Sequence, residues 1–348
     1  MSTMKAARIF GPHDLRLVDV PIPRVGDQDV LCKVVRAGMC GTDYAIYTGE
    51  FSFVKSGQVP FPMTPGHEWS GIVEKIGPAV HNVKVGDRVV GDTGVSCGQC
   101  YDCLVGQYYH CKQSRAVGTI KAWDGAYAEY ILMPARHIIP LPDRVSFDNG
   151  AMVEPAATAL GAVTQAQVGP GDSVLVLGSG PIGIAAAVLA KICGAAKVVI
   201  AARKDFKLQA ALDLGVDAAI NTTRTALEDA VKREFADWGV EKIVEAAGST
   251  DLFKRALDLI NPDGILSVVA FYERKVDGFD IDCMVFGNVK IKASSGSLGM
   301  YRPILRLMAA GRLDLTSLIT DRYVLDQVPQ AMRDMQKKNE RRIKMMIG

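Results

Sequence analysis

Residues 174–183 read Val-Leu-Val-Leu-Gly-Ser-Gly-Pro-Ile-Gly, an apolar run followed by the pattern G-x-G-x-x-G. The glycines Gly178, Gly180 and Gly183 permit a tight turn, a close approach of the backbone to a pyrophosphate, and close packing of a helix on a strand. Pro181 and Ile182 begin the expected helix, whose N-terminal dipole favours a phosphate group. A strand, this turn and a helix in succession predict a dinucleotide-binding site.

The segments around this turn alternate between expected strands and helices from residue 174 to residue 270. Such alternation predicts an α/β fold with a parallel, doubly wound (Rossmann) sheet. Before the turn, residues 5–141 hold short β-rich runs separated by Gly and Pro, which is typical of a β-barrel-like domain with long loops.

The chain of 348 residues is long enough for two domains, since one domain usually takes roughly 100–200 residues. We expect a first, β-rich domain at residues 1–152, with a cysteine-rich lobe at 92–115, and a nucleotide-binding domain at 153–288. The remaining segment, 289–348, is too short for a third domain and is expected to pack on the first.

Composition narrows the class of protein. Hydrophobic residues make up 49% of the chain, charged residues 22%, and the net charge is +2, so neither nucleic acid nor an acidic membrane surface is an expected partner. The N-terminus lacks the apolar run of a secretory signal, and no run reaches the roughly 20 residues of a membrane span. We therefore expect a cytoplasmic protein, in which eight cysteines indicate metal or redox chemistry rather than disulfides.

Four of these cysteines form a compact motif. They are spaced C-x2-C-x2-C-x7-C at the positions Cys97, Cys100, Cys103 and Cys111. Four thiolates around one tetrahedral zinc leave no open position, so this motif predicts a structural zinc site. An iron–sulfur cluster is less favoured because the bacterial C-x3-C-P step is absent.

A second group of metal-binding side chains stands outside this motif, at Cys40, His67, Glu68 and Glu154. A thiolate, an imidazole and a carboxylate from separate loops form the ligand set of a catalytic zinc that keeps a position for water or substrate. Asp43 is suited to accept the N–H of a ligand histidine and so fix its tautomer. Each residue alone is weak support, because a lone Cys is usually a small buried hydrophobe.

The end of the second expected strand bears on the choice of cofactor. NAD-binding proteins usually carry Asp or Glu about 20 residues after the glycine turn, and here that region reads Ala202-Arg203-Lys204. Arg203, supported by Lys204 or Lys207, could pair with a 2′-phosphate, which favours NADP over NAD. The alternative is a solvated basic start of a helix that Asp205 caps.

The order of these motifs along the chain resembles that of the zinc-containing medium-chain dehydrogenase/reductase family. The resemblance covers essentially the whole chain and is strongest to the polyol (sorbitol or L-iditol) dehydrogenase branch. The resemblance implies a GroES-like catalytic domain interrupted by a Rossmann domain, in a homotetramer or homodimer. Cys40, His67 and Glu68 match the family's catalytic zinc ligands. Glu154 matches a carboxylate of the polyol branch, where many simple alcohol dehydrogenases have Cys.

The resemblance also implies a reaction. Thr42 matches the hydroxyl residue that takes the substrate's proton, while Ala45 stands where many members carry a relay histidine. Proton exit would then use the ribose, water, Tyr44 or Tyr47. Two zinc ions per chain, one catalytic and one structural, would support hydride transfer between a secondary alcohol and NADP or NAD.

The expected substrate is a polyol or sugar alcohol, on the strength of Glu154. Alternatives are a vicinal diol, an amino alcohol such as threonine, an inositol or a sugar phosphate. A more distant alternative is a non-catalytic NADPH-binding protein on the same fold, although such relatives typically lose the ligands that this chain keeps.

Overall fold

The computed structural model describes residues 2–297, 299–337 and 341–348, which divide into two compact units. The first unit comprises Met1–Glu154 and Tyr301–Gly348, and the second comprises Pro155–Met300. Within the described residues, each helix is too short or too polar to cross a membrane.

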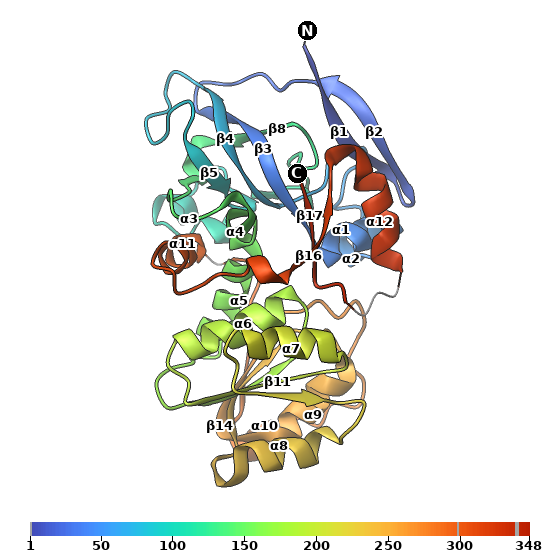
Figure 1. Ribbon diagram of the computed structural model, residues 1–348, viewed down its shortest axis with the longest axis vertical. Coiled ribbons are helices and arrows are strands. Elements are labelled where there is room, and N and C mark those ends of the chain that lie inside the picture. Colours follow the sequence, from blue (N-terminus) through green and yellow to red (C-terminus); the bar gives the residue numbers. More distant parts are fainter. Residues whose placement is uncertain (1, 298, 338–340) are drawn as a thin grey trace. The chain divides into compact units, whose positions relative to one another are not determined.

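The second unit is built on a parallel sheet whose strands follow the order β12-β11-β10-β13-β14-β15. These strands are β10 (Ser173–Leu177), β11 (Lys197–Ala202), β12 (Ala218–Asn221), β13 (Val240–Glu245), β14 (Ile260–Val268) and β15 (Lys290–Ala293). The helices between them are α6 (Pro181–Ile192), α7 (Asp205–Asp213), α8 (Leu227–Phe235), α9 (Thr250–Leu259) and α10 (Asp282–Gly287). Figure 1 shows α6 and α7 on one side of this sheet and α8, α9 and α10 on the other.

The predicted fold class is confirmed by this arrangement. Strand β10 is buried along its whole length, as expected for a central parallel strand covered on both faces by helices. One core cluster joins Leu175 and Val199 of the sheet to Leu227 and Phe235 of α8. Strands β11 and β12 lie on one side of β10, and β13, β14 and β15 lie on the other. This strand order is that of a doubly wound sheet.

The first unit is mainly β-structure. Its larger sheet has the order β16-β17-β3-β4-β5-β9, with β8 also paired to β3. The strands of this unit are β1 (Thr3–Gly11), β2 (Asp14–Pro21), β3 (Asp29–Met39), β4 (Glu68–Ile76), β5 (Arg88–Gly91), β6 (Gly94–Val95), β7 (Arg115–Ala116), β8 (Tyr130–Pro134), β9 (Ile138–Pro140), β16 (Ile319–Tyr323) and β17 (Lys344–Ile347). Helices are α1 (Gly41–Thr48), α2 (Ser52–Lys55), α3 (Tyr101–Leu104), α4 (Phe147–Ala151), α11 (Tyr301–Ala309) and α12 (Val328–Gln336), and α5 (Val153–Gln165) leads into the second unit.

The C-terminal strand completes this sheet. Strand β17 pairs antiparallel with the end of β3, so that Met345 stands opposite Met39. Four consecutive residues of β17 are buried, which is expected for a strand inside a sheet covered on both faces. This pairing brings β17 next to Cys40, which directly follows β3 and caps α1.

Candidate functional site

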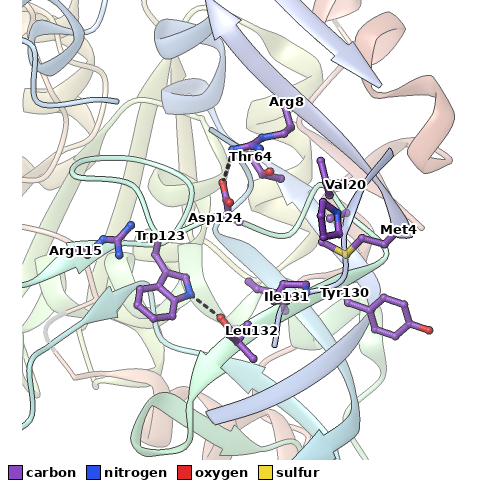
Figure 2. Close-up of a pocket in the computed structure, with 14 residues that line it drawn as sticks. Met4, Arg8, Val20, Thr64, Arg115, Trp123, Asp124, Tyr130, Ile131 and Leu132 are labelled. Atoms are coloured by element: carbon purple, nitrogen blue, oxygen red, sulfur yellow. Dashed lines mark hydrogen bonds and ion pairs between the residues drawn. The ribbon is translucent and has the colours of Figure 1, made fainter. Parts of the chain in front are cut away.

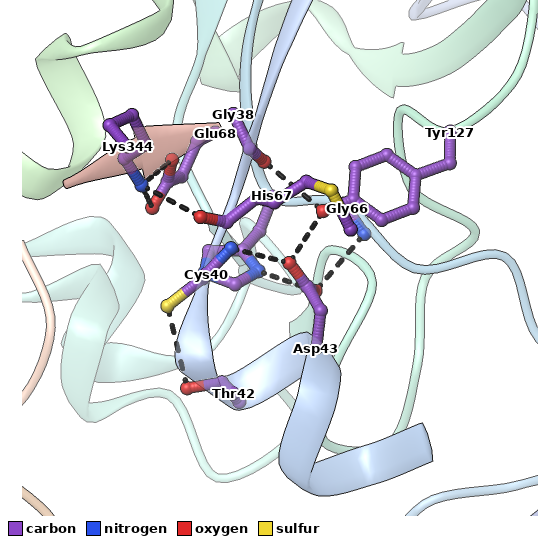
Figure 3. Close-up of polar contacts among 10 residues, drawn as sticks. Gly38, Cys40, Thr42, Asp43, Gly66, His67, Glu68, Tyr127 and Lys344 are labelled. Carbon is purple, nitrogen blue, oxygen red and sulfur yellow. Dashed lines mark hydrogen bonds and ion pairs between the residues drawn. The ribbon is translucent and has the colours of Figure 1, made fainter. Parts of the chain in front are cut away.

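Cys40, His67 and Glu68 converge in the first unit, although Cys40 is 27 residues from His67 in the sequence. One potential ligand atom from each lies within 4.8 Å of the other two. His67 and Glu68 are buried, with exposed fractions of 6% and 1%. A thiol, an imidazole and a carboxylate at this separation fit a zinc ion with an open position. Figure 3 shows these side chains together with Thr42, Asp43 and Lys344, which contact them.

Local backbone structure places two of these residues. Cys40 is the N-cap of α1 and follows the end of β3 directly. Gly66 precedes His67 with a φ of 96°, and a Cβ there would stand 2.5 Å from the Tyr127 ring. Glycine is therefore required before His67 on both conformational and steric grounds.

The Asp43 carboxylate contacts Cys40, His67 and Tyr127. Its Oδ2 accepts the Cys40 N–H at 2.9 Å and the Tyr127 hydroxyl at 2.7 Å, and its Oδ1 lies 3.4 Å from His67 Nδ1. Burial by itself lowers the pKa of His67, but the Asp43 carboxylate and the Cys40 side chain together raise that pKa well above its ordinary value. An acid facing Nδ1 leaves Nε2 to bind a metal, as the sequence predicts for Asp43.

The Glu68 carboxylate faces a buried lysine that sequence reasoning missed. Lys344 Nζ donates to Glu68 Oε1 at 2.7 Å, to Oε2 at 2.5 Å and to the Met39 carbonyl at 3.0 Å. Gly38 leaves room for this carboxylate, because a Cβ at that position would stand 2.1 Å from Glu68 Oε2. A lysine inside the otherwise apolar segment 343–347 was the available signal.

The remaining predicted residues lie around this group. The Thr42 Oγ1 is 3.7 Å from the Cys40 Sγ, on the first turn of α1. Glu154 lies in the first turn of α5 and does not belong to the group of three. Its negative charge nevertheless adds to the factors that raise the pKa of Lys344 and of the buried Tyr301, which places it in their electrostatic neighbourhood.

The four cysteines of the lobe also meet. Cys97, Cys100, Cys103 and Cys111 each bring a sulfur within 4.8 Å of the others, and none forms a disulfide. The Cys100 and Cys103 sulfurs are 3.5 Å apart, and those of Cys97 and Cys103 are 3.9 Å apart. Sulfurs at about 2.3 Å from one zinc stand about 3.8 Å apart in a tetrahedron. Backbone hydrogen bonds from Gln99 and Cys100 lower the pKa of Cys97 to about 6, which favours the thiolate that a metal requires.

The glycine turn in the second unit has the geometry that its sequence predicts. Gly178 has a φ of 109°, and a Cβ on Gly183 would stand 2.1 Å from the Gly178 carbonyl oxygen. Gly180 is the N-cap of α6, and a Cβ there would meet nothing within 4 Å. Pro181 and Ile182 form the first turn of α6, so open space lies at a helix N-terminus, as a pyrophosphate requires.

At the end of β11, Ala202 is the last strand residue and Arg203 is exposed. Asp205, the first acid after the strand, accepts from Asn221 Nδ2 at 2.6 Å and forms an ion pair with Arg224. Lys204 is the N-cap of α7 and Asp205 is its first residue, so the capping role expected of Asp205 is wrong. Arg203 and Lys204 are both exposed, as a solvated basic start of the helix also requires. Lys207 lies within the first turn of α7.

With this geometry in place, comparisons with known proteins identify the class. Residues 26–143 match the alcohol dehydrogenase GroES-like domain, and residues 181–310 match the zinc-binding dehydrogenase domain. L-threonine 3-dehydrogenase of Chromobacterium violaceum is 31% identical over 95% of this chain and 96% of its own. Sorbitol dehydrogenase of Bacillus subtilis is 30% identical over 97% of this chain and 95% of its own.

A solved structure agrees with these matches. The crystal structure of a zinc-binding dehydrogenase from Sinorhizobium meliloti 1021 bound to NADP superimposes with a TM-score of 0.92 at 29% identity, covering 100% of this chain and 99% of that one. This chain belongs to the zinc-containing medium-chain dehydrogenase/reductase family. It is an oxidoreductase of the zinc-dependent, NAD(P)-linked alcohol dehydrogenase type.

Proposed function

We propose that the protein oxidises a secondary alcohol of a polyol or sugar alcohol, and reduces the corresponding ketone, with NADP as the preferred cofactor. The observation that supports this proposal is the convergence of Cys40, His67 and Glu68, with the further carboxylate of Glu154 at the position characteristic of the polyol branch.

The residues of the first unit have separate roles in this reaction. Cys40 and His67 would hold the zinc, with Glu68 or Glu154 as the carboxylate ligand. A zinc ion in this position supplies Lewis acidity that lowers the pKa of an alcohol, and the nicotinamide supplies the hydride chemistry. Thr42 would orient the alcohol through Oγ1 and relay its proton, while its own hydroxyl proton passes to the ribose, to water, to Tyr44 or to Tyr47. Asp43, whose Oδ1 lies 3.4 Å from His67 Nδ1, would hold the His67 ring in place.

The cysteine motif has a structural role in the proposal. Four thiolates occupy all positions of a tetrahedral zinc, so the second ion of each chain would stabilise the lobe at 92–115 without contacting substrate. The proposed stoichiometry is therefore two zinc ions per chain. Thiolate ligands require reducing conditions, which favours a cytoplasmic location.

Arg203 supports the proposed preference for NADP. The side chain is exposed directly after β11, and the nearest acid, Asp205, already pairs with Arg224. A guanidinium at this position can form charge-assisted hydrogen bonds with a 2′-phosphate, whereas the acid that would hold a ribose hydroxyl is replaced by Ala202.

A homodimer or homotetramer is the proposed assembly. The strand at the edge of the second unit's sheet, β15, follows a segment with several exposed apolar side chains. The largest are Phe271, Ile281, Val285 and Phe286, the last 92% exposed. Light scattering on the purified protein tests the assembly, and a monomer at micromolar concentration would contradict it.

Oxidation of an amino alcohol is the second candidate function, because one of the reported relatives is named L-threonine 3-dehydrogenase. Initial rates should be measured with sorbitol, xylitol, L-iditol, galactitol, myo-inositol, 2,3-butanediol and threonine, each with NADP and NAD. Highest kcat/KM for a polyol with NADP supports the proposal. Highest kcat/KM for threonine replaces the first candidate by the second, and turnover of no alcohol in the panel contradicts both.

A further inference from the structure

A cavity of about 310 Å³ lies in the first unit between the β1–β2 hairpin and the segment 123–132, and none of its lining residues belongs to either metal site. It is lined by residues that include Arg8, Arg115, Trp123, Asp124, Tyr130 and Ile131. Figure 2 shows these side chains around the cavity. Its volume is at the lower end of the range of about 300–1,000 Å³ for small-molecule pockets.

One wall of this cavity is aromatic and held in place. Trp123 Nε1 donates to the Leu132 carbonyl at 2.5 Å, and the Arg115 guanidinium lies over the Trp123 ring at 5.0 Å from its centroid. Both the indole N–H and one face of the ring have partners, which orient the Trp123 side chain. The wall therefore offers a preformed apolar surface next to a positive charge.

The cavity carries more positive than negative charge. Arg8 and Arg115 contribute guanidinium groups, and Asp124 contributes the carboxylate, which lies 3.5 Å from Arg8 and also accepts the Thr64 N–H at 2.8 Å. Arg115 donates to the carbonyls of Lys121 and Ala122, and no ion pair is found for it within the described part of the chain. One positive charge is thus left without a carboxylate partner.

Arg8 also has an unused donor. Its Nε is buried and has no hydrogen-bond partner within the described residues, while its NH2 group donates to the Pro62 carbonyl at 2.9 Å. The Nε atom has almost no accessible surface, so a ligand in the cavity would contact the outer N–H groups of this guanidinium. A guanidinium with a spare N–H is suited to a carboxylate.

We propose that this cavity binds a small amphipathic carboxylate, whose acid group pairs with Arg8 and whose apolar part lies on Trp123 and Ile131. Arg115 adds the second positive charge that makes an anion preferable to a neutral molecule of the same shape. The site is separate from the dehydrogenase reaction, so it stands whether or not the proposed substrate is correct.

Hexanoate is a suitable probe, with hexanamide as its uncharged counterpart. The metal-loaded protein would be labelled with 5-fluorotryptophan and titrated while ¹⁹F spectra are recorded, and Trp123→Phe would assign the Trp123 resonance. We expect a saturable shift of that resonance with hexanoate and at least tenfold weaker binding of hexanamide. Equal binding of the two probes, or an unchanged Trp123 resonance, overturns the proposal.

Arginine variants test which side chains bind the carboxylate of hexanoate. Arg8→Gln and Arg115→Gln should each weaken hexanoate binding at least tenfold, and the second keeps the test decisive if the first does not fold. Arg16→Gln is the matched control, because Arg16 is an exposed arginine of the same hairpin that pairs with Asp14 outside the cavity. Cys40→Ser should bind hexanoate as the wild type does. Loss of binding in Cys40→Ser, or wild-type binding in both arginine variants, overturns the proposal.

Discussion

The Lys344 ammonium group lies 2.7 Å and 2.5 Å from the two carboxylate oxygens of Glu68, and both side chains are almost completely buried. The two residues are 276 positions apart in the sequence. Because Glu68 also belongs to the group that could hold a metal, a bound ion would share the carboxylate charge with Lys344. We therefore expect Lys344 to limit how much of that charge reaches an ion.

Removing one partner of this pair should strongly destabilise the protein. Loss of one partner from a buried ion pair costs about 3–5 kcal/mol, so Lys344→Met is expected to lower the free energy of urea unfolding by about that amount. The double variant Lys344→Met/Glu68→Gln should recover part of the loss because it leaves no buried charge. A double variant less stable than the single one would contradict this account. Lys5→Met, which breaks the exposed pair with Asp326, should remain close to wild type.

Weakening the support behind His67 should lower metal affinity. Partners that orient a metal ligand typically contribute 10–100-fold to affinity or activity, so Asp43→Asn should raise the zinc dissociation constant by about that factor. Tyr127→Phe keeps the ring against Gly66 but loses the 2.7 Å hydrogen bond to Asp43, and a smaller loss in the same direction is expected. Competition with a chelator measures the zinc dissociation constant of each variant. Tyr323→Phe, which loses a hydroxyl contact to Asp334, is the control, and equal effects in all three variants would argue against this role.

The choice of cofactor should depend on Arg203. A hydrogen bond to a charged group contributes about 1.5–3 kcal/mol, so Arg203→Ser should raise the KM for NADP by about 10–150-fold and leave the KM for NAD nearly unchanged. Steady-state rates at a fixed alcohol concentration give both values. Arg233→Ser changes an exposed arginine of α8 and should affect neither. Equal changes for NADP and NAD in Arg203→Ser would exclude a contact with the 2′-phosphate.

Stability should fall in acid because of His137. Burial lowers the pKa of this histidine to about 4, and the neutral ring accepts the Ser96 N–H at 3.0 Å. The unfolded chain, with an ordinary pKa near 6.5, binds the proton first as pH falls. The contribution of the neutral ring is therefore complete above pH 6.5 and is lost progressively toward pH 4, by about 3 kcal/mol. Urea unfolding of wild type and His137→Gln at pH 7 and pH 4 tests this expectation. Equal losses of unfolding free energy in the two proteins between these pH values would contradict it.

Local sequence patterns predicted the glycine turn and the cysteine cluster. The turn at Gly178, Gly180 and Gly183 needs only a strand before it and a helix after it, and all three glycines have the predicted geometry. The cysteine motif is similarly local, since its members span 15 residues from Cys97 to Cys111. In both cases neighbours in the sequence are neighbours in space, so spacing alone carries the structural information.

Contacts between distant residues were not predictable in the same way. Lys344 meets Glu68 because β17 joins the end of β3, which also pairs with the start of β4. Tyr127 reaches Asp43 from 84 positions away. No period or spacing encodes such pairings, which follow from sheet order, and the sequence offered only the oddity of a lysine within an apolar strand.

We propose that the chain holds an open catalytic zinc at Cys40 and His67 and a closed structural zinc at the four cysteines. Zinc analysis of purified wild type, Cys40→Ser and Cys103→Ser, together with alcohol oxidation rates, tests this proposal. We expect two zinc ions per wild-type chain, and a folded Cys40→Ser that keeps one and turns over at least 1,000-fold more slowly, about 4 kcal/mol in the activation barrier. Cys103→Ser should lose the structural ion and stability. A Cys40→Ser protein that keeps both ions and wild-type turnover would contradict the claim.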